Sequence, residues 1–161
     1  MKCKFWQTGI YRISYQHMNS FKITLSIIVV LFGLTVVKGQ DLMKHRWKNR
    51  VIVIMVTEKS SSLLSDQLEV FKQNQAGLEE RKLVIYQATP DAHKLGMHND
   101  QWSKDGTLYT QHKLSTEPFE VILIGLDGHV KKRQAQIFTT EQLFPLIDEM
   151  PMRQIELRND D

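Results

Sequence analysis

The feature that most constrains the fold is a block of six consecutive apolar residues, Val51-Ile52-Val53-Ile54-Met55-Val56. A half-buried strand or an amphipathic helix would interleave polar residues, so a continuous, largely β-branched block is typical of a strand buried on both faces. The polar residues that follow, Thr57 to Ser62, supply a turn and several candidate helix caps. The block therefore predicts a central strand that leads into a helix.

The rest of the chain predicts the order β-α-β-(insert)-β-β-α. The first helix rests on apolar residues at helical spacing: Leu63, Leu64, Leu68, Phe71 and Leu78. The predicted elements after the first strand are a helix over 61–76 that ends near Gly77, strands over 81–89, 119–125 and 130–136, and a last helix over 141–149 that Thr140 caps and Pro151 ends. Asp127-Gly128 predicts a hairpin turn between the last two strands. Residues 90–116 form a long polar insert in which the sequence assigns no element.

This order is typical of thioredoxin-like topology. The predicted fold class is α/β, with a four- to five-stranded mixed sheet flanked by helices. Charges over 130–136 suit a strand at the edge of the sheet. Pro118 stands directly before the third strand, where thioredoxin folds carry a cis-proline that faces the redox turn. A trans-proline at a strand start is the alternative, and the sequence is compatible with both.

The chain has one cysteine, Cys3. The turn where a thioredoxin-like domain would carry its redox pair reads Thr57-Glu58-Lys59-Ser60-Ser61-Ser62. The thiolate is the nucleophile of dithiol exchange, so the sequence excludes dithiol oxidoreductase activity. We expect a protein that is not an enzyme and needs no cofactor. A thiol-independent enzyme that uses the same groove is the alternative.

Residues 1–39 have the pattern of a leader. Lys22 precedes an apolar run over 23–37, which Lys38-Gly39 follows. This pattern predicts a secretory signal peptide cut after Gly39, and an uncleaved anchor over 23–37 is the alternative. Met18 would give a more ordinary start than Met1. We therefore expect one domain over 40–161, periplasmic or secreted, or held at the inner membrane by the anchor.

Net charge gives no case for a nucleic-acid-binding protein. Five of the 21 basic residues and none of the 18 acidic residues fall within 1–39. Residues 40–161 therefore carry 16 basic and 18 acidic residues. The positive charge of the whole chain belongs to the leader, and the predicted domain is close to neutral.

Three segments carry a resemblance to a known family. They are Lys44 to Arg50, Leu123 to Gly128 and Ile147 to Arg153. Together they resemble the DUF4174 domain of exported bacterial proteins and of the sushi-repeat-containing and coiled-coil-domain-containing-80 extracellular proteins of animals. The resemblance covers about 42–158 and implies a thioredoxin-like fold with no established activity. The family's hairpin usually reads Ile-Gly-Lys-Asp-Gly, and Leu126 replaces its lysine here.

The first candidate site is the groove that redox turns line in thioredoxin folds. Its residues are Thr57, Glu58, Lys59, Ser60, Glu117 and Pro118. The backbone before a cis-proline can pair with an extended peptide by strand addition, which needs no thiol. An ordinary loop with capping serines is the alternative. The groove leads us to expect a non-catalytic binding module for a peptide, a protein or a glycan outside the cytoplasm.

The second candidate is a basic patch that would bind a polyanion. Its residues are Lys44, Arg46, Lys48, Arg50, Lys131 and Lys132. They would meet if the segment before the first strand runs beside the hairpin, and sulfated glycans or anionic lipid heads would be the targets. Solvated flanks of a buried strand, neutralised by acidic residues such as Glu79, Glu80 and Asp148, are the alternative.

Two further sets are expected to bind nothing. The insert holds imidazole and carboxylate groups suited to a metal: His93, His98 and His112 with Asp91, Asp100 and Asp105. Their spacing is loose, so we expect no metal. Trp47, Met150, Met152 and Arg153 are expected to be structural, with Trp47 plugging the core and Arg153 either pairing with Asp148 or lying over Trp47.

Overall fold

The computed structural model describes residues 42–98 and 100–160. The elements are η1 (Met43–His45), β1 (Arg50–Val56), α2 (Ser62–Gln73), α3 (Gln75–Glu80), β2 (Leu83–Ala88), β3 (His93–Leu95), α4 (Thr107–His112), β4 (Phe119–Ile124), β5 (Val130–Gln134), α5 (Thr140–Asp148) and α6 (Pro151–Asp160). The predicted leader, with Cys3, Met18 and the possible anchor over 23–37, lies outside the described residues.

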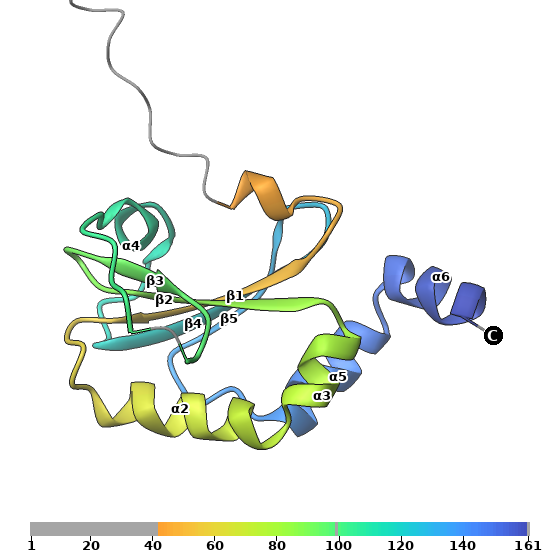
Figure 1. The fold of residues 1–161 in the computed structure, drawn as a ribbon, viewed down its shortest axis with the longest axis horizontal. Helices are drawn as coiled ribbons and strands as arrows, with labels where there is room; N and C mark the ends of the chain where they lie inside the picture. Colours follow the sequence, from red (N-terminus) through yellow and green to blue (C-terminus); the bar gives the residue numbers. More distant parts are fainter. Residues whose placement is uncertain (1–41, 99, 161) are drawn as a thin grey trace, which may run out of the picture. The chain divides into compact units, whose positions relative to one another are not determined.

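The strands form one mixed sheet in the order β3-β2-β1-β4-β5. β1 lies at the centre, parallel to β2 and antiparallel to β4, and the β2–β3 and β4–β5 pairs are antiparallel. The charged strand β5 lies at an edge, as its sequence predicts. Figure 1 shows the sheet between two layers of helix. The predicted α/β class, with a mixed sheet flanked by helices, is confirmed.

Both faces of β1 are covered, which explains its unbroken apolar sequence. Ile52, Ile54 and Val56 pack in a core with residues of α2, α3 and α5. Val51, Val53 and Met55 face the other side, where α4 supplies the cover. No side chain of the six is more than 2% exposed. Burying each one contributes about 1.5–3 kcal/mol, so this block is the main source of stability at the centre of the sheet.

The helix predicted over 61–76 is two helices, and its predicted end is wrong. α2 stops at Asn74, whose side-chain amide donates a 3.1 Å hydrogen bond to the carbonyl of Val70. α3 begins directly afterwards and contains Gly77. A Cβ at Gly77 would lie 2.7 Å from the ring of Phe144, so this glycine makes room for a neighbouring helix and does not end its own.

The insert over 90–116 folds back on the sheet. It supplies the short edge strand β3, opposite Tyr86–Ala88 of β2, and the helix α4. A Cβ at Gly106 would lie 1.8 Å from the carbonyl oxygen of Pro90. The insert therefore packs against its own beginning, a contact between distant positions that gives no periodic signal in the sequence.

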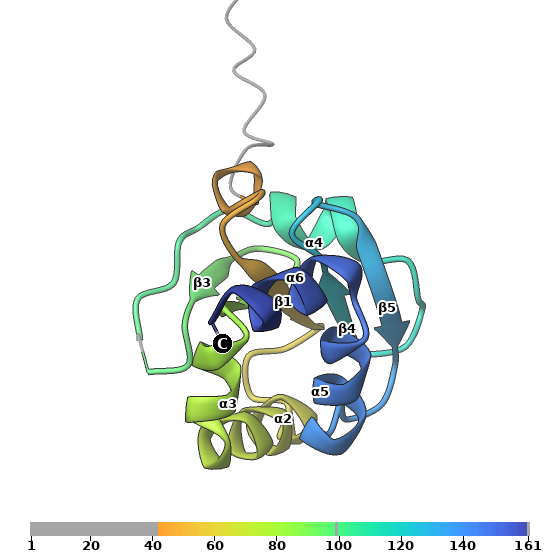
Figure 2. The ribbon, with the colours of Figure 1, turned by 90° about the vertical axis from the view of Figure 1, so that its right-hand side faces the viewer.

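The C-terminal segment also differs from the prediction. Thr139, and not Thr140, stands at the N-cap position of α5. α5 ends at Asp148, and Pro151 then opens the helix α6. Proline suits the first turn of a helix because the N–H that it lacks has no partner there. Figure 2 shows α6 crossing the sheet at the end where β1 begins.

Candidate functional site

The turn that corresponds to a redox site is polar and exposed. Thr57, Glu58, Lys59 and Ser60 lie on the surface between β1 and α2. The ammonium of Lys59 lies 3.5 Å from a carboxylate oxygen of Asp91 and 4.9 Å from the ring centroid of Trp102. Because its residues are exposed and carry no thiol, the turn offers charge and hydroxyl groups only.

Pro118 lies opposite this turn in the trans form, since the described residues contain no cis peptide bond. The cis alternative is therefore wrong. The carbonyl of Pro118 accepts a 3.0 Å hydrogen bond from the N–H of Thr57. The carbonyl of Glu117 accepts a 2.6 Å bond from the ammonium of Lys113. The backbone carbonyls that an added peptide would use at this position already have partners within the domain.

A buried carboxylate beneath Pro118 holds the segment in place. Glu120 is fully buried and accepts hydrogen bonds from the N–H groups of Leu114 (3.2 Å) and Ser115 (3.0 Å). It also pairs with Lys113 at 3.3 Å and with Arg133. Burial opposes ionisation of Glu120, but the Arg133 bond and the two backbone donors outweigh it and hold its pKa below the usual value. This cluster is structural, and the sequence analysis did not find it.

The basic segment before β1 does run beside the hairpin. The N–H of Trp47 donates a 2.7 Å hydrogen bond to the carbonyl of Leu126, and Arg46 packs beside Gly128. Lys44, Arg46, Lys48, Lys131 and Lys132 are exposed. Lys131 pairs with Asp127 at 2.6 Å.

Two residues of this region differ from their expected places. Arg50 is 1% exposed, so it does not belong to the surface patch. Trp47 is 59% exposed and is no core plug. Its φ is 64°, and the Cζ of Arg46 lies 5.4 Å from its ring centroid. Arg153 pairs with Asp148 at 3.4 Å, as one of the two predicted alternatives has it.

The histidines of the insert do not converge. His93 Nδ1 hydrogen-bonds the carbonyl of Asp105 at 2.9 Å, and His98 is exposed. Burial, and then the charge of Arg133, lower the pKa of His112. Within 42–98 and 100–160, no three His, Cys, Asp or Glu side chains are grouped so that they could hold a metal ion.

The first half of β2 is an open strand edge, which the sequence analysis also missed. β3 pairs only with Tyr86–Ala88. The N–H of Arg50 donates to the carbonyl of Lys82, so even-numbered residues of this strand face β1. The N–H of Gly96 donates to the carbonyl of Ile85, so odd-numbered residues face outward. The N–H and carbonyl of Leu83 therefore point to an edge where no described strand pairs with them.

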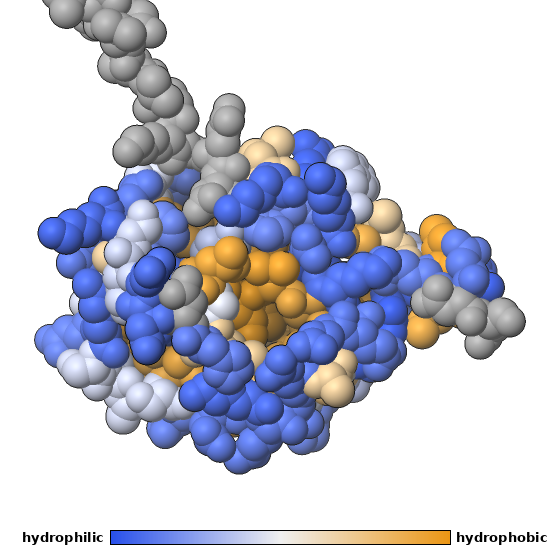
Figure 3. Space-filling model, in the orientation of Figure 1, coloured by the Kyte–Doolittle hydropathy of each residue, from blue (hydrophilic) through white to orange (hydrophobic). Residues whose placement is uncertain are grey.

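Side chains beside this edge are apolar and partly uncovered. Leu83 and Met97 are half-buried and pack on the core under α2 and α3. Figure 3 shows an apolar hollow in the middle of this face of the molecule. Gln87 lies on the same side of β2 and donates a 2.8 Å hydrogen bond to the carbonyl of Gly96, while its own buried Oε1 has no partner.

Comparison with known proteins agrees with this fold. Residues 41–156, which include every strand of the sheet, match the family model DUF4174, described as a domain of unknown function. The chain belongs to the DUF4174 family. No curated protein matches the sequence. None of the described helices of this DUF4174 domain is long and apolar enough to span a bilayer.

Several solved chains match, and one of them is similar to the DUF4174 domain across most of its length. It is the reduced 2-Cys peroxiredoxin of Plasmodium vivax, at 10% identity and a TM-score of 0.52, over 73% of this chain and 72% of that one. At this identity the likeness shows the fold alone, and it confirms the predicted thioredoxin-like fold. The described part of the DUF4174 domain contains no cysteine, in keeping with the predicted absence of a redox pair.

Proposed function

We propose that this DUF4174 domain is an exported, non-catalytic binding module that takes an extended peptide along the open edge of β2. The observation that carries the proposal is the outward-facing N–H and carbonyl of Leu83 on the half of β2 that β3 leaves unpaired, beside the apolar hollow of Figure 3. A missing redox pair supports binding over chemistry. We place the peptide here and not at Thr57–Ser60 and Pro118, because the carbonyls of Glu117 and Pro118 already accept hydrogen bonds within the domain.

Strand addition suits this edge for two reasons. A peptide would exchange hydrogen bonds with the N–H and the carbonyl of Leu83, and each such bond adds roughly 0.5–1.5 kcal/mol net. Alternate peptide side chains would lie over the hollow, since successive strand residues point to opposite faces. An apolar residue at every second position of the peptide would therefore be preferred.

A backbone amide NMR titration tests this proposal. The probe is a short peptide that alternates valine and serine, and the control is the same peptide N-methylated at alternate amides. We expect shifts at Leu83, Ile85 and Met97 with the probe and none with the control, because methylation removes the donors. Shifts at Thr57–Ser60 and Glu117 instead would show that the peptide binds in the groove between the Thr57–Ser60 turn and Pro118. A lack of shifts at both places would contradict peptide binding.

A second candidate function rests on the contact between the segment before β1 and the hairpin. This contact places Arg46 beside the turn that leads into Lys131 and Lys132, and these three cations are exposed, as are Lys44 and Lys48. We propose polyanion binding there as the alternative. Heparin fragments should then bind with an affinity that falls steeply with salt, since exposed charges are screened over about 8 Å at physiological ionic strength. Peptide binding at β2 should change little with salt.

A further inference from the structure

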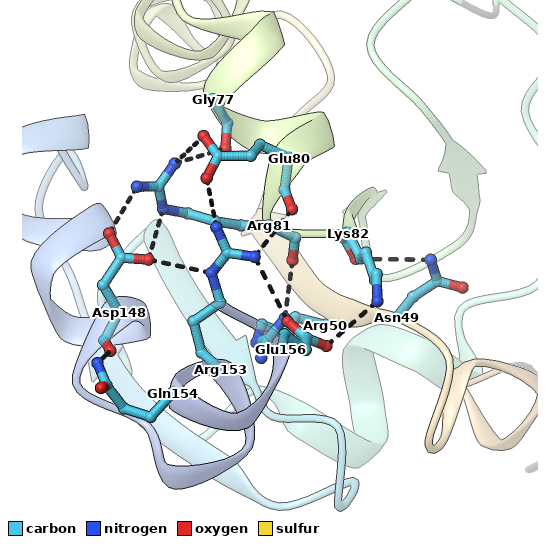
Figure 4. Close-up of polar contacts among 10 residues, drawn as sticks. All are labelled: Asn49, Arg50, Gly77, Glu80, Arg81, Lys82, Asp148, Arg153, Gln154 and Glu156. Atoms are coloured by element: carbon cyan, nitrogen blue, oxygen red, sulfur yellow. Dashed lines mark hydrogen bonds and ion pairs between the residues drawn. The ribbon is translucent and has the colours of Figure 1, made fainter. Parts of the chain in front are cut away.

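Lys94 on β3 is a half-buried cation that forms no ion pair with any described carboxylate. Every other lysine or arginine that is buried or half-buried in the described part of the chain does pair with one: Arg50, Arg81, Lys113, Arg133 and Arg153. Figure 4 shows the pairs of Arg50, Arg81 and Arg153. Partly desolvated charges are ordinarily paired, so Lys94 indicates an anion that the described residues do not provide.

Lys94 lines a surface cavity, so a ligand from solvent can reach it. The cavity has a volume of about 300 Å³, at the lower end of the range for small-molecule pockets. Lys44, which is exposed, is a second cation in its wall. Among the described residues that line the cavity, none is an aspartate or glutamate and only Leu95 is aliphatic. The wall therefore suits a polar anion and does not suit an apolar ligand.

Two aromatic rings hold the ammonium groups beside this cavity. The ammonium of Lys94 lies 5.2 Å from the ring centroid of Trp102, and that of Lys44 lies 5.7 Å from the ring centroid of Tyr86. Both rings belong to the wall of the cavity. A cation–π contact orients an ammonium without neutralising its charge. The two charges therefore stay at the cavity and remain available to an anion.

Backbone hydrogen bonds fix the wall before a ligand binds. The N–H of His93 donates to the carbonyl of Ser103 at 3.0 Å, and the N–H of Ser103 donates to the carbonyl of His93 at 2.8 Å. This bridge attaches the insert to β3 and places Trp102 next to Lys94. A preformed wall lowers the entropic cost of ordering the protein around a ligand.

We propose that this cavity binds a sulfate or phosphate monoester of a small hydroxylated compound, such as a sugar. The ester oxygens would accept hydrogen bonds from the ammonium groups of Lys94 and Lys44, since lysine binds such groups as a point charge. The exposed hydroxyl of Ser103 would bond a hydroxyl group of the ligand. A free sugar phosphate and a sulfated sugar residue of a glycan share this chemistry. The site shares only Lys44 with the basic patch and does not rest on peptide binding at β2.

Calorimetric titration of the full chain tests the site. The probes are glucose 6-phosphate and glucose 6-sulfate, with glucose as the uncharged match and inorganic phosphate and sulfate as the bare anions. We expect at least one ester to bind about tenfold or more tightly than glucose and than its bare anion, because only the ester carries both the charge and the hydroxyl groups. Tighter binding of glucose 6-phosphate would identify a phosphate ester, and tighter binding of glucose 6-sulfate a sulfate ester. No binding of either ester, or equal binding of an ester and its bare anion, would overturn the proposal.

Variants locate the binding at Lys94. Lys94→Met removes the charge and should weaken ester binding about tenfold or more, whereas Lys94→Arg keeps the charge and should retain binding. Both variants should fold, because Lys94 has no ion pair among the described residues to lose.

Lys59→Met is the matched control for Lys94→Met. The ammonium of Lys59 lies 4.9 Å from the ring centroid of the same Trp102, but Lys59 does not line the cavity and pairs with Asp91 at 3.5 Å. This variant should weaken ester binding less than about threefold, as should Lys48→Met in the basic patch. Unchanged ester binding by Lys94→Met, or an equal loss in either control variant, would overturn the proposal.

Discussion

At the scale of single residues, Gly106 determines how the insert packs. Replacing it by alanine would place a Cβ 1.8 Å from the carbonyl oxygen of Pro90, and backbone cannot rotate away as a side chain can. We expect Gly106→Ala to lower the free energy of unfolding by about 3 kcal/mol, at the upper end of overpacking costs. Denaturant midpoints measure the change.

Gly128→Ala is the matched control for this residue. Gly128 has a φ of +82°, but a Cβ there would approach nothing closer than 3.6 Å. The strain of a left-handed alanine should cost about 1–2 kcal/mol. Gly106 has an ordinary φ of −86°, so a loss in Gly106→Ala no larger than that in Gly128→Ala would contradict the contact with Pro90 as the reason for glycine at Gly106.

At the scale of elements, α6 is held to the domain by charge. Arg153 is 2% exposed and reaches Asp148 at 3.4 Å, Glu156 at 3.5 Å and the carboxylate of Glu80. We expect Arg153→Ala to cost about 2–3 kcal/mol, as for lost hydrogen bonds to charged groups. Because these contacts hold α6 alone, the variant should raise the rate of amide hydrogen exchange over Pro151–Asp160 more than it does in β1.

Arg158→Ala provides the comparison within the same helix. Arg158 is exposed, and such substitutions usually change stability by less than about 0.5 kcal/mol. If the rate of hydrogen exchange in α6 of the Arg153→Ala protein were unchanged, the ion pairs of Arg153 would not hold this helix. Apolar contacts would then hold α6 to the domain.

At the scale of the whole molecule, buried carboxylates make stability depend on pH. Burial opposes ionisation of Glu120 and Glu156, but Arg133 and the backbone donors at the first, and Arg50 at the second, outweigh it, so both pKa values lie below the usual value of a glutamate. The unfolded chain then binds more protons in acid than the folded one. The stabilisation is complete above the unfolded value and is lost as pH falls through the folded values.

Thermal unfolding across the acidic range measures this dependence. We expect a higher melting temperature at neutral pH than near pH 3, and a shallower dependence for Glu120→Gln, because one of the linked protons is removed. Glu117→Gln, at an exposed position three residues before Glu120 and outside β4, should keep the full dependence. A Glu120→Gln protein with an unchanged slope would contradict the assignment.

How far the sequence predicts this protein depends on the range of the interactions. β1, β2, β4 and β5 were predictable because each carries its own apolar or turn pattern, and the Asp127-Gly128 turn needs only local conformation. β3 was missed because three residues are too short for a periodic signal. The end of the first helix was misplaced because Gly77 makes room for Phe144 of another helix and does not end its own.

The sequence by itself determined the α/β class, the central place of Val51–Val56 and the absence of dithiol chemistry, since hydrophobic pattern and residue identity are properties of the chain alone. Only the tertiary structure decided that Arg50 is buried, that Trp47 is exposed and that half of β2 has a free edge. These features depend on which distant segments meet. A basic residue before a strand looks the same in the sequence whether solvent or α6 lies above it.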